Sequence, residues 1–207
     1  MTGVQTCALP ICSLVRPEAT GYGNVYFAEA MINSIKDSIK GKTVAISGFG
    51  NVAWGAALKV NHLGGKVVTI SGPDGYIYDA DGISGEKIDY MLELRASNMD
   101  IVAPYAQKFP KAKFVAGRRP WEVKCDVALP CATQNELNGD DANNLVKNGC
   151  KCVSEGANMP STPEAIEIFH KNKILFAPGK ASNAGGVATS GLEMSQKIGR
   201  ASCRERV

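Results

Sequence analysis

The sequence predicts an α/β fold, a doubly wound and mostly parallel sheet with helices on both faces. Three observations support this prediction. Short β-branched runs alternate with helical patterns along the chain, a glycine turn joins one run to a helix at 48–50, and polar loops follow several other runs. Alternation of this kind favours parallel strands that are joined by helical crossovers.

In the first half of the chain, glycines end the helical patterns and β-branched runs follow them. Gly41 ends the first pattern, and Gly64 and Gly65 end the second, because glycine adopts the left-handed conformation that closes a helix. The second helix and its two flanking runs form a unit of the length that a parallel crossover requires. The Gly- and Asp-rich stretch 71–84 indicates turns or a hairpin. The elements expected here are a helix over 22–40, a strand over 42–47, a helix over 51–63, a strand over 66–71, and helices over 86–96 and 101–108.

In the second half, the strands are shorter and end in turn residues. Pro130 stops an apolar run, and Pro163 stands in the first turn of a helix, where its missing N–H removes no helical bond. Cys150 and Cys152 are two positions apart along one apparent strand, so we expect both thiols on the same face of the sheet. The elements expected here are strands over 113–116 and 126–129, a helix over 140–148, a strand over 151–154, a helix over 163–171, a strand over 174–176 and a helix over 184–196.

The composition excludes several classes of protein. Hydrophobic residues make up 44% and charged residues 21% of the 207 positions, which is typical of a globular protein. The apolar runs are too short to cross a membrane, and the net charge of +3 gives no reason to expect a nucleic-acid partner. The cysteines between 13 and 196 lack paired Cys-x-x-Cys spacing, so we expect no metal site and a reduced, cytoplasmic chain with buried thiols.

The glycine turn over 48–53 indicates a phosphate site. Gly48 permits a tight turn, Gly50 lets the backbone approach a pyrophosphate, and Ala53 stands where a third glycine often permits close helix packing. Bare amides around the two glycines and the dipole of the following helix favour phosphate groups. This strand, turn and helix predict a Rossmann-like dinucleotide-binding site, and the alternative is an ordinary glycine-rich turn.

The end of the second strand is where a dinucleotide ribose is expected. Asp74 lies 24 residues after Gly50, about where an acid bonds the ribose 2′-hydroxyl, but Pro-Asp-Gly is also a turn sequence in its own right. No Arg or Lys stands between Ser71 and Glu86 to hold a 2′-phosphate, whereas the small Ser71 and Gly72 leave room for one. These residues do not decide between NAD and NADP.

Three polar loops follow strands of the second half, over 130–135, 155–160 and 177–186. Ligands of open α/β sheets bind beyond the carboxyl ends of the strands, so we expect these loops to line one cleft. Asn158 and Asn183 are candidates to bond a carboxamide, and capping or turn roles are the alternatives.

Five motifs, over 16–23, 48–53, 130–135, 155–160 and 183–196, together resemble the hexameric glutamate dehydrogenases of bacteria and lower eukaryotes. The resemblance implies the nucleotide-binding domain of an enzyme that interconverts L-glutamate with 2-oxoglutarate and ammonia, using NADP or NAD. It also implies that Thr20 and Asn183 contact the nicotinamide, and that Ser190 binds the distal carboxylate of the substrate with Val187 lining the same pocket. Ser190 is otherwise a small packing residue. The expected coenzyme contacts are Thr20, Gly48, Phe49, Gly50, Asn51, Val52, Ser71, Gly72, Asp74, Ala132, Thr133, Gln134, Asn158 and Asn183.

The resemblance also implies parts that 13–196 does not contain. Members of the family have a substrate domain that supplies a catalytic lysine and aspartate, so we assign no catalytic residue here and expect this polypeptide to be inactive by itself. The parent enzyme is expected to be a homohexamer. The segment 187–196 looks more like NADP-preferring members and 71–75 is similar to NAD-using ones, and we favour NADP. A stand-alone dinucleotide-binding module with a sensing or regulatory role is the alternative.

The two ends of the chain differ from its middle. Residues 1–12 lack the basic region and the long apolar core of a signal peptide, and 198–207 show no helical or strand period. Both stretches resemble translated sequencing adapters. We therefore expect a non-native leader over 1–12 and a non-native tail over 197–207 around a dinucleotide-binding domain over 13–196, with natural divergent ends as the alternative.

Overall fold

A computed structural model describes residues 16–97 and 100–204 of the chain. The expected leader over 1–12 lies outside the described residues, as do positions 205–207 of the expected tail. Within the described residues, the strands form one seven-stranded sheet in the order β4-β3-β2-β1-β5-β6-β7. The strands are β1 (Thr43–Ile46), β2 (Lys66–Gly72), β3 (Gly75–Tyr78), β4 (Lys113–Ala116), β5 (Val127–Leu129), β6 (Cys152–Ser154) and β7 (Leu175–Ala177).

The sheet is mostly parallel, as predicted. The neighbours β2, β1, β5, β6 and β7 pair in parallel, whereas β3 pairs antiparallel with both β2 and β4. Gly72 pairs with Gly75 at the turn between β2 and β3, which confirms a hairpin within 71–84. The chain moves outward from β1 to β4 and then returns to the other side of β1, so the strand order reverses between β1 and β5. That reversal is the place where open α/β sheets bind ligands.

Helices cover both faces of the sheet, because alternate residues of β1 pack against different sets of helices. Val44 and Ile46 belong to a core cluster that includes residues of the first four helices, whereas Ala45 belongs to a second cluster with residues of α5 and α6. The helices are α1 (Arg16–Ser34), α2 (Asn51–His62), α3 (Glu86–Ala96), α4 (Ala103–Lys108), α5 (Gly139–Lys147), α6 (Pro163–Lys171), α7 (Gly179–Ser182) and α8 (Gly185–Arg204), with a 3-10 turn at Pro120–Glu122.

The two clusters correct one expectation about the cysteines. Cys152 lies in β6 and packs in the first cluster, but Cys150 precedes that strand and packs in the second, so the two thiols face opposite sides of the sheet. The expected strand alternation does not apply, because Cys150 still belongs to the turn after α5. Among the described residues, Cys125, Cys131, Cys150 and Cys152 are free thiols, and all four are buried.

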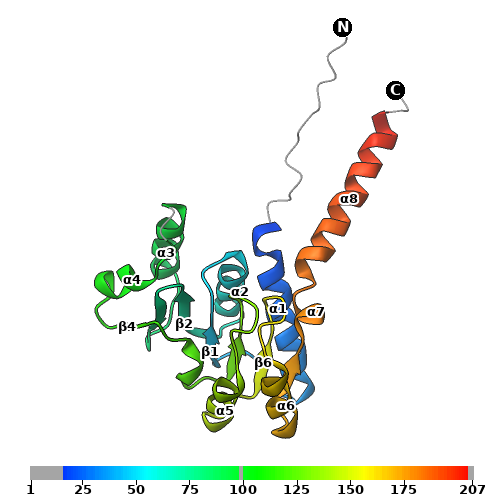
Figure 1. Ribbon diagram of the computed structural model, residues 1–207. Coiled ribbons are helices and arrows are strands. Elements are labelled where there is room, and N and C mark those ends of the chain that lie inside the picture. The colour runs from blue at the N-terminus through cyan, green and yellow to red at the C-terminus, as the bar shows by residue number, and fades with distance from the viewer. Residues whose placement is uncertain (1–15, 98–99, 205–207) are drawn as a thin grey trace.

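Helix α1 packs closely against α2 and against α8, and glycines make both contacts possible (Figure 1). A Cβ added to Gly21 would lie 2.4 Å from the carbonyl oxygen of Val52 in α2, and one added to Gly55 would lie 2.6 Å from that of Glu18. A Cβ on Gly23 would lie 2.8 Å from the Cα of Gly185 at the start of α8. The N-terminal helix is thereby joined to the element that follows the last strand.

Helices α1 and α8 have bounds that differ from the predicted ones. Helix α1 begins at Arg16 rather than at 22 and ends at Ser34, because Lys36 adopts a left-handed φ of 59° well before Gly41. Helix α8 continues to Arg204 instead of ending at 196 (Figure 1). A helix that has already formed adds each residue at little cost, so residues without a period of their own can extend it.

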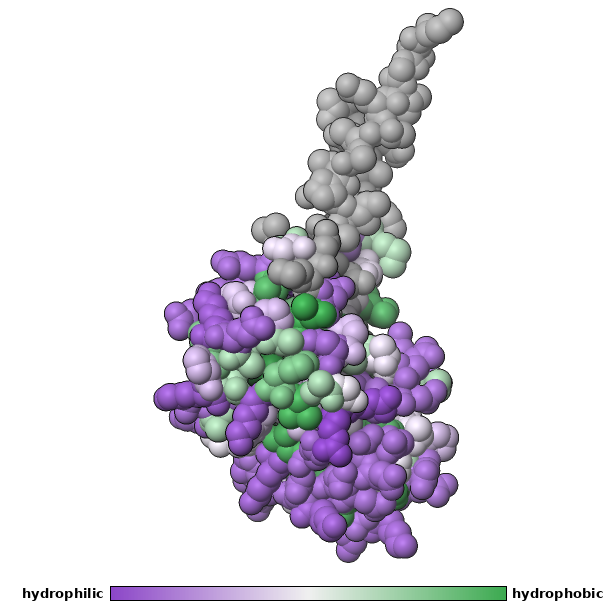
Figure 2. Space-filling model, turned by 60° about the vertical axis from the view of Figure 1, so that its left-hand side comes forward, coloured by the Kyte–Doolittle hydropathy of each residue, from purple (hydrophilic) through white to green (hydrophobic). Residues whose placement is uncertain are grey.

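Apolar side chains remain exposed on the same two helices. They are Tyr26 and Phe27 on α1, and Val187, Leu192 and Met194 on α8. Figure 2 shows an apolar band on one face of an otherwise mostly hydrophilic surface. Within the part of the chain that the structure describes, no helix is both long enough and apolar enough to cross a membrane.

Candidate functional site

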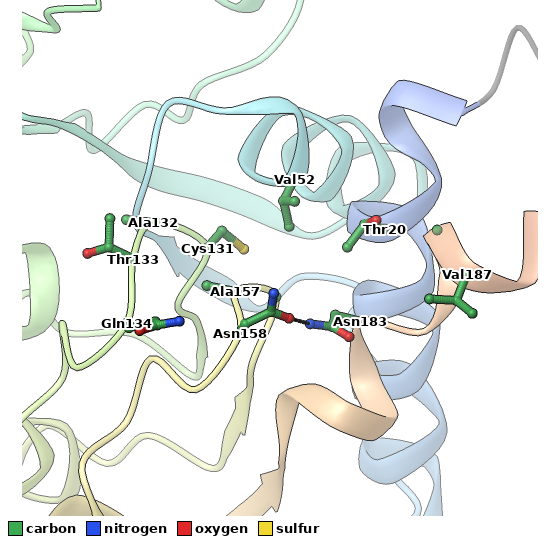
Figure 3. Close-up of a pocket in the computed structure, with 12 residues that line it drawn as sticks. Thr20, Val52, Cys131, Ala132, Thr133, Gln134, Ala157, Asn158, Asn183 and Val187 are labelled. Carbon is green, nitrogen blue, oxygen red and sulfur yellow. Dashed lines mark hydrogen bonds between the residues drawn. The ribbon is translucent and has the colours of Figure 1, made fainter. Parts of the chain in front are cut away.

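Two cavities lie beyond the carboxyl ends of the parallel strands. The larger cavity, about 730 Å³, lies among the starts of α1 and α2, the loops after β5 and β6, and the α7–α8 junction (Figure 3). The smaller cavity, about 410 Å³, lies between the glycine turn and the end of β2. Both are lined by Cys131, Ala132 and Thr133, so the two cavities adjoin each other in the region where the strand order reverses. We call the two adjoining cavities together the cleft.

Most of the predicted contact residues line this cleft. Those at the larger cavity are Thr20, Val52, Ala132, Thr133, Gln134, Asn158, Asn183 and Val187. Those at the smaller cavity are Gly48, Phe49, Gly50, Ser71, Gly72, Ala132 and Thr133. The three polar loops after β5, β6 and β7 thus meet around one space, as the sequence analysis expected.

Asn51, Asp74 and Ser190 do not line either cavity. Asn51 is exposed in the first turn of α2, and Ser190 lies on α8 three residues after Val187. The Asp74 carboxylate accepts the N–H groups of Val102 and Ala103 at 2.9–3.0 Å, where α4 begins. The Asp74 carboxylate is therefore bonded to the backbone at the start of α4, and its contact with a ribose stays a prediction.

The two glycines of the turn serve different purposes. Gly48 has a φ of +94°, and a Cβ there would lie 2.7 Å from the carbonyl oxygen of Cys131. Gly50 has an ordinary φ of −86° as the N-cap of α2, and a Cβ there would meet only Nη1 of Arg95, at 3.9 Å. Gly48 is needed by the fold, and Gly50 leaves open the space beside the helix start.

The amides of this turn differ in what they can bind. The Gly48 N–H donates to Oγ of Ser71 at 2.8 Å, so the expectation that this amide is bare is wrong. At Gly50, no side chain caps α2, and by helix geometry the amides of residues 51–53 have no acceptor within the helix. The carbonyl of Phe49 accepts from Nε1 of Trp54 at 3.0 Å and from Nη1 of Arg95 at 2.7 Å, which fixes the turn. The amides that remain open to an anion are therefore those of the first turn of α2.

The smaller cavity holds charged residues that the sequence analysis missed. Arg95, Arg118 and Arg119 line it together with Asp100 and Glu136. These arginines come from α3 and from the loop after β4, whereas the residues that directly follow β2 in the sequence contain no Arg or Lys before Glu86. Only the folded chain brings them to the end of β2, and no local pattern marks them.

Glu136 is a buried carboxylate on the wall of the smaller cavity. It is 3% exposed, and its Oε1 accepts from Oγ of Ser47 at 2.9 Å and from the Ala132 N–H at 3.0 Å. The guanidinium of Arg119 donates to the backbone carbonyl of Glu136. Burial raises the pKa of Glu136 to about 7, although the hydrogen bonds from Ala132 and Ser47 and the charge of Arg119 act to lower it. Its charge therefore changes near neutral pH, next to a site suited to anions.

The larger cavity has an amide pair on one side. Nδ2 of Asn183 donates to Oδ1 of Asn158 at 2.7 Å, and Figure 3 shows this pair across the cavity from Thr20 and Val52. Amide donors and acceptors at a cavity wall suit a planar carboxamide ligand.

Cys131 lies at the wall shared by both cavities but is not activated. Burial raises the pKa of its thiol well above the ordinary value, so the thiol stays protonated at neutral pH. Among residues 16–97 and 100–204, no group of three or more His, Cys, Asp or Glu side chains is placed to hold a metal ion. The groups that the cleft offers to a ligand thus include side-chain amides, backbone N–H groups and arginines.

Comparison with known proteins links the chain to one family. The family model described as Glutamate/Leucine/Phenylalanine/Valine dehydrogenase matches residues 12–207. A crystal structure of Plasmodium falciparum glutamate dehydrogenase superposes with a TM-score of 0.87 at 45% identity, covering 90% of this chain and 40% of that one.

Curated relatives are named for different coenzymes. The chain is 72% identical over 184 residues to the NAD-specific glutamate dehydrogenase of Bacteroides fragilis, which is 89% of this chain and 41% of that protein. It is 54% identical over 188 residues to the NADP-specific glutamate dehydrogenase of Haemophilus influenzae, which is 91% of this chain and 42% of that protein. The chain thus spans about two fifths of the length of these relatives.

Proposed function

Because the chain belongs to the glutamate/leucine/phenylalanine/valine dehydrogenase family, we propose that it is the dinucleotide-binding part of a glutamate dehydrogenase, with the domain over 13–196. The whole enzyme interconverts L-glutamate with 2-oxoglutarate and ammonia, with hydride transfer to or from NADP(H) or NAD(H). The single observation that supports this most is the pair of adjoining cavities, one beside the uncapped start of α2 and the other lined by the amide pair.

The residues of the cleft fit the three parts of a nicotinamide dinucleotide. The diphosphate binds the amides at the start of α2, where the absence of a Cβ on Gly50 leaves space beside the helix. The nicotinamide occupies the larger cavity, with Thr20, Asn158 and Asn183 as its contacts, and the adenosine half occupies the smaller cavity. When bound, the nicotinamide supplies the hydride chemistry, and the protein binds and orients it.

We propose that the adenosine half of the site accepts a 2′-phosphate, so that NADP(H) is favoured. Asp74 is held by α4, while Ser71 and three arginines line the cavity. Guanidinium groups suit phosphate oxygens because their N–H donors form a planar fork. Asp100 lines the same cavity and opposes the binding of an anion, so NAD(H) remains a second coenzyme.

The substrate is expected at the α8 side of the larger cavity. Val187 lines that cavity and is 75% exposed, and Ser190 follows one turn later on the same helix. A hydroxyl there provides a donor for the distal carboxylate of glutamate, which an apolar side chain does not. No catalytic residue is proposed within 13–196, so we expect this chain by itself to bind coenzyme without oxidising glutamate. We also propose a homohexameric parent enzyme and a cytoplasmic location, the latter in line with the four free buried thiols of the part of the chain that the structure describes.

Titration of the chain with NADPH and NADH, followed by coenzyme fluorescence, tests the proposal. We expect saturable binding of both, with NADPH the tighter ligand, and no glutamate-dependent reduction of NADP or NAD. Failure to bind either coenzyme would contradict the nucleotide site, and glutamate oxidation by this chain alone would contradict the assignment of catalysis to another domain.

The variant Arg95→Ala tests the choice of coenzyme. Arg95 lines the smaller cavity and also bonds to the carbonyl of Phe49. Loss of a charged contact to phosphate costs about 1.5–3 kcal/mol, so NADPH binding is expected to weaken roughly tenfold or more. NADH is the internal control, because any general disturbance of the turn affects both coenzymes. Equal weakening of both would mean that Arg95 does not contact a 2′-phosphate.

A further inference from the structure

We infer that Glu155 is a positioning residue, which holds the nicotinamide contacts in place without lining the cleft itself. Its carboxylate ties the loop after β6 to helix α7, and this places the amide pair of Asn158 and Asn183 at the wall of the larger cavity. The inference rests on the proposed function, because it concerns the nicotinamide end of the same site.

Glu155 accepts hydrogen bonds from two backbone N–H groups and from one side-chain hydroxyl. Oε1 accepts from the Ser161 N–H at 3.2 Å, and Oε2 accepts from the Gly179 N–H at 2.7 Å. The backbone carbonyl of Glu155 also accepts from Oγ of Ser182 at 2.6 Å. Glu155 is 3% exposed, so these bonds are sheltered from competing water.

These bonds enclose both members of the amide pair. Asn158 lies on the short loop between Glu155 and Ser161, and the carboxylate closes that loop. Asn183 is the C-cap of α7, and both the first and the last residue of that helix bond to Glu155. The bond between Asn158 and Asn183, at 2.7 Å, therefore joins two segments that Glu155 already holds through its own hydrogen bonds.

Close packing leaves these segments little freedom to shift. A Cβ added to Gly156 would lie 2.5 Å from Sγ of Cys131, and one added to Gly179 would lie 2.7 Å from the carbonyl oxygen of Ala157. Each oxygen of Glu155 accepts a different N–H, so both oxygens must be acceptors. Glutamine cannot replace the carboxylate here, because its –NH₂ group would face one of the two N–H donors.

Glu155→Gln is therefore expected to release one side of the bridge and disturb the amide pair. The diphosphate and adenosine contacts come from the start of α2 and from the smaller cavity, which Glu155 does not line. We expect the Kd for NADPH to rise about tenfold, whereas the Kd for 2′,5′-ADP, which lacks the nicotinamide, stays within about twofold. If the chain binds only NADH, the matched pair is NADH and ADP.

The control variant is Asp126→Asn, which makes the same carboxylate-to-amide change at the amino end of β5. Oδ2 of Asp126 accepts the Thr43 N–H at 2.9 Å, and this is a bond that the carbonyl oxygen of Asn can retain. Asp126 lines neither cavity, so both ligands are expected to bind as they do to the wild-type chain.

A double variant tests the route of the effect. If Glu155 acts through Asn183, the loss of NADPH affinity in Glu155→Gln/Asn183→Ala is smaller than the sum of the two single losses. Additive losses would mean that Glu155 acts on the coenzyme by another route, and would overturn the inference.

The outcomes separate the inference from the function on which it rests. If the wild-type chain binds neither ligand, the proposed function fails. If the wild-type chain binds both, and Glu155→Gln weakens both equally or neither, the positioning role is overturned. Should Glu155→Gln not fold, as judged by circular dichroism, Glu155→Asp is measured instead, because its shorter side chain cannot span both N–H groups. A selective loss of NADPH affinity supports the inference, and an unselective loss contradicts it.

Discussion

Gly48 and Gly50 are two positions apart in the glycine turn, yet the reasons for glycine at each differ. The first has a left-handed backbone and lies against Cys131, whereas the second has an ordinary backbone and faces the cleft. The sequence pattern predicts both glycines as phosphate-site residues. The structure assigns the first to packing and hydrogen bonding with Ser71, and leaves the second beside the open start of α2.

This difference predicts that one alanine substitution lowers stability and that the other lowers the affinity for coenzyme. Gly48→Ala combines an unfavourable φ with a contact of 2.7 Å to a backbone oxygen, and is expected to lower the free energy of unfolding by roughly 2–4 kcal/mol. Gly50→Ala has space for its methyl group and is expected to change stability by less than about 1 kcal/mol, but to weaken NADPH binding at least about tenfold. Urea unfolding and NADPH titration of both variants check this, and a normal NADPH affinity in Gly50→Ala would contradict it.

Glu136 predicts a pH dependence of stability. Its pKa is about 7 in the folded protein and near 4.5 in an exposed chain, so the folded state binds the proton more tightly. Protonation of Glu136 therefore stabilises the folded state. This contribution to the free energy of unfolding is fully present below about pH 4.5 and is lost as pH rises through about 7. Glu136→Gln keeps both hydrogen bonds, because both reach the single atom Oε1, and it carries no charge.

The free energy of unfolding of Glu136→Gln is therefore expected to rise relative to the wild type as pH increases from 5 to 8, by on the order of 3 kcal/mol. Urea unfolding at several pH values measures this difference. A difference that does not change with pH would show that Glu136 stays ionised, or stays protonated, throughout the range.

At the scale of the elements, the predictions were most accurate where local signals were strong. Helix α3 has the predicted bounds, and α6 begins at the proline that was expected in its first turn. The short helix α7 was not predicted, because its four residues carry no periodic pattern. The bounds of α1 and α8 were wrong at one or both ends, and these are the helices that pack on each other through Gly23 and Gly185.

Alanine substitutions at two helical glycines test how much the close packing of α1 on α2 contributes to stability. Gly21→Ala places a methyl group 2.4 Å from the backbone of α2 and is expected to lower the free energy of unfolding by roughly 2–4 kcal/mol. Gly191→Ala on α8 meets nothing within 4 Å and is expected to raise it by up to about 1 kcal/mol, because alanine favours the helix. Thermal and urea unfolding of both variants test the contrast. Similar effects of the two would mean that α1 does not pack on α2 as described.

At the scale of the whole molecule, the cleft depends on the order of the strands. The phosphate site follows β1 and the amide pair follows β6 and β7, and they meet because the chain crosses from β4 back to β5. The alternation of elements predicts a doubly wound sheet but does not specify which strand neighbours which.

Coenzyme binding at this cleft predicts a stabilisation of the whole domain. At a coenzyme concentration of 100 times Kd, the free energy of unfolding is expected to rise by about 2.7 kcal/mol, which raises the melting temperature by roughly 5–10 °C. Thermal unfolding with and without NADPH measures the shift, and Gly50→Ala at the same NADPH concentration is expected to show a smaller one. An unchanged melting temperature at saturation would contradict binding to the folded domain.

The sequence by itself determined the features that arise within a few neighbouring residues. These are the alternation of strands and helices, the glycine turn, and the loops that carry Asn158 and Asn183. Tertiary structure alone decided which distant groups meet. Arg95 reaches the glycine turn, Asp74 reaches the start of α4, and the carboxylate of Glu155 joins the loop after β6 to α7. The physical reason is that periodicity and turn preferences act along the chain, whereas hydrogen bonds and ion contacts depend on distances that only the packed sheet sets.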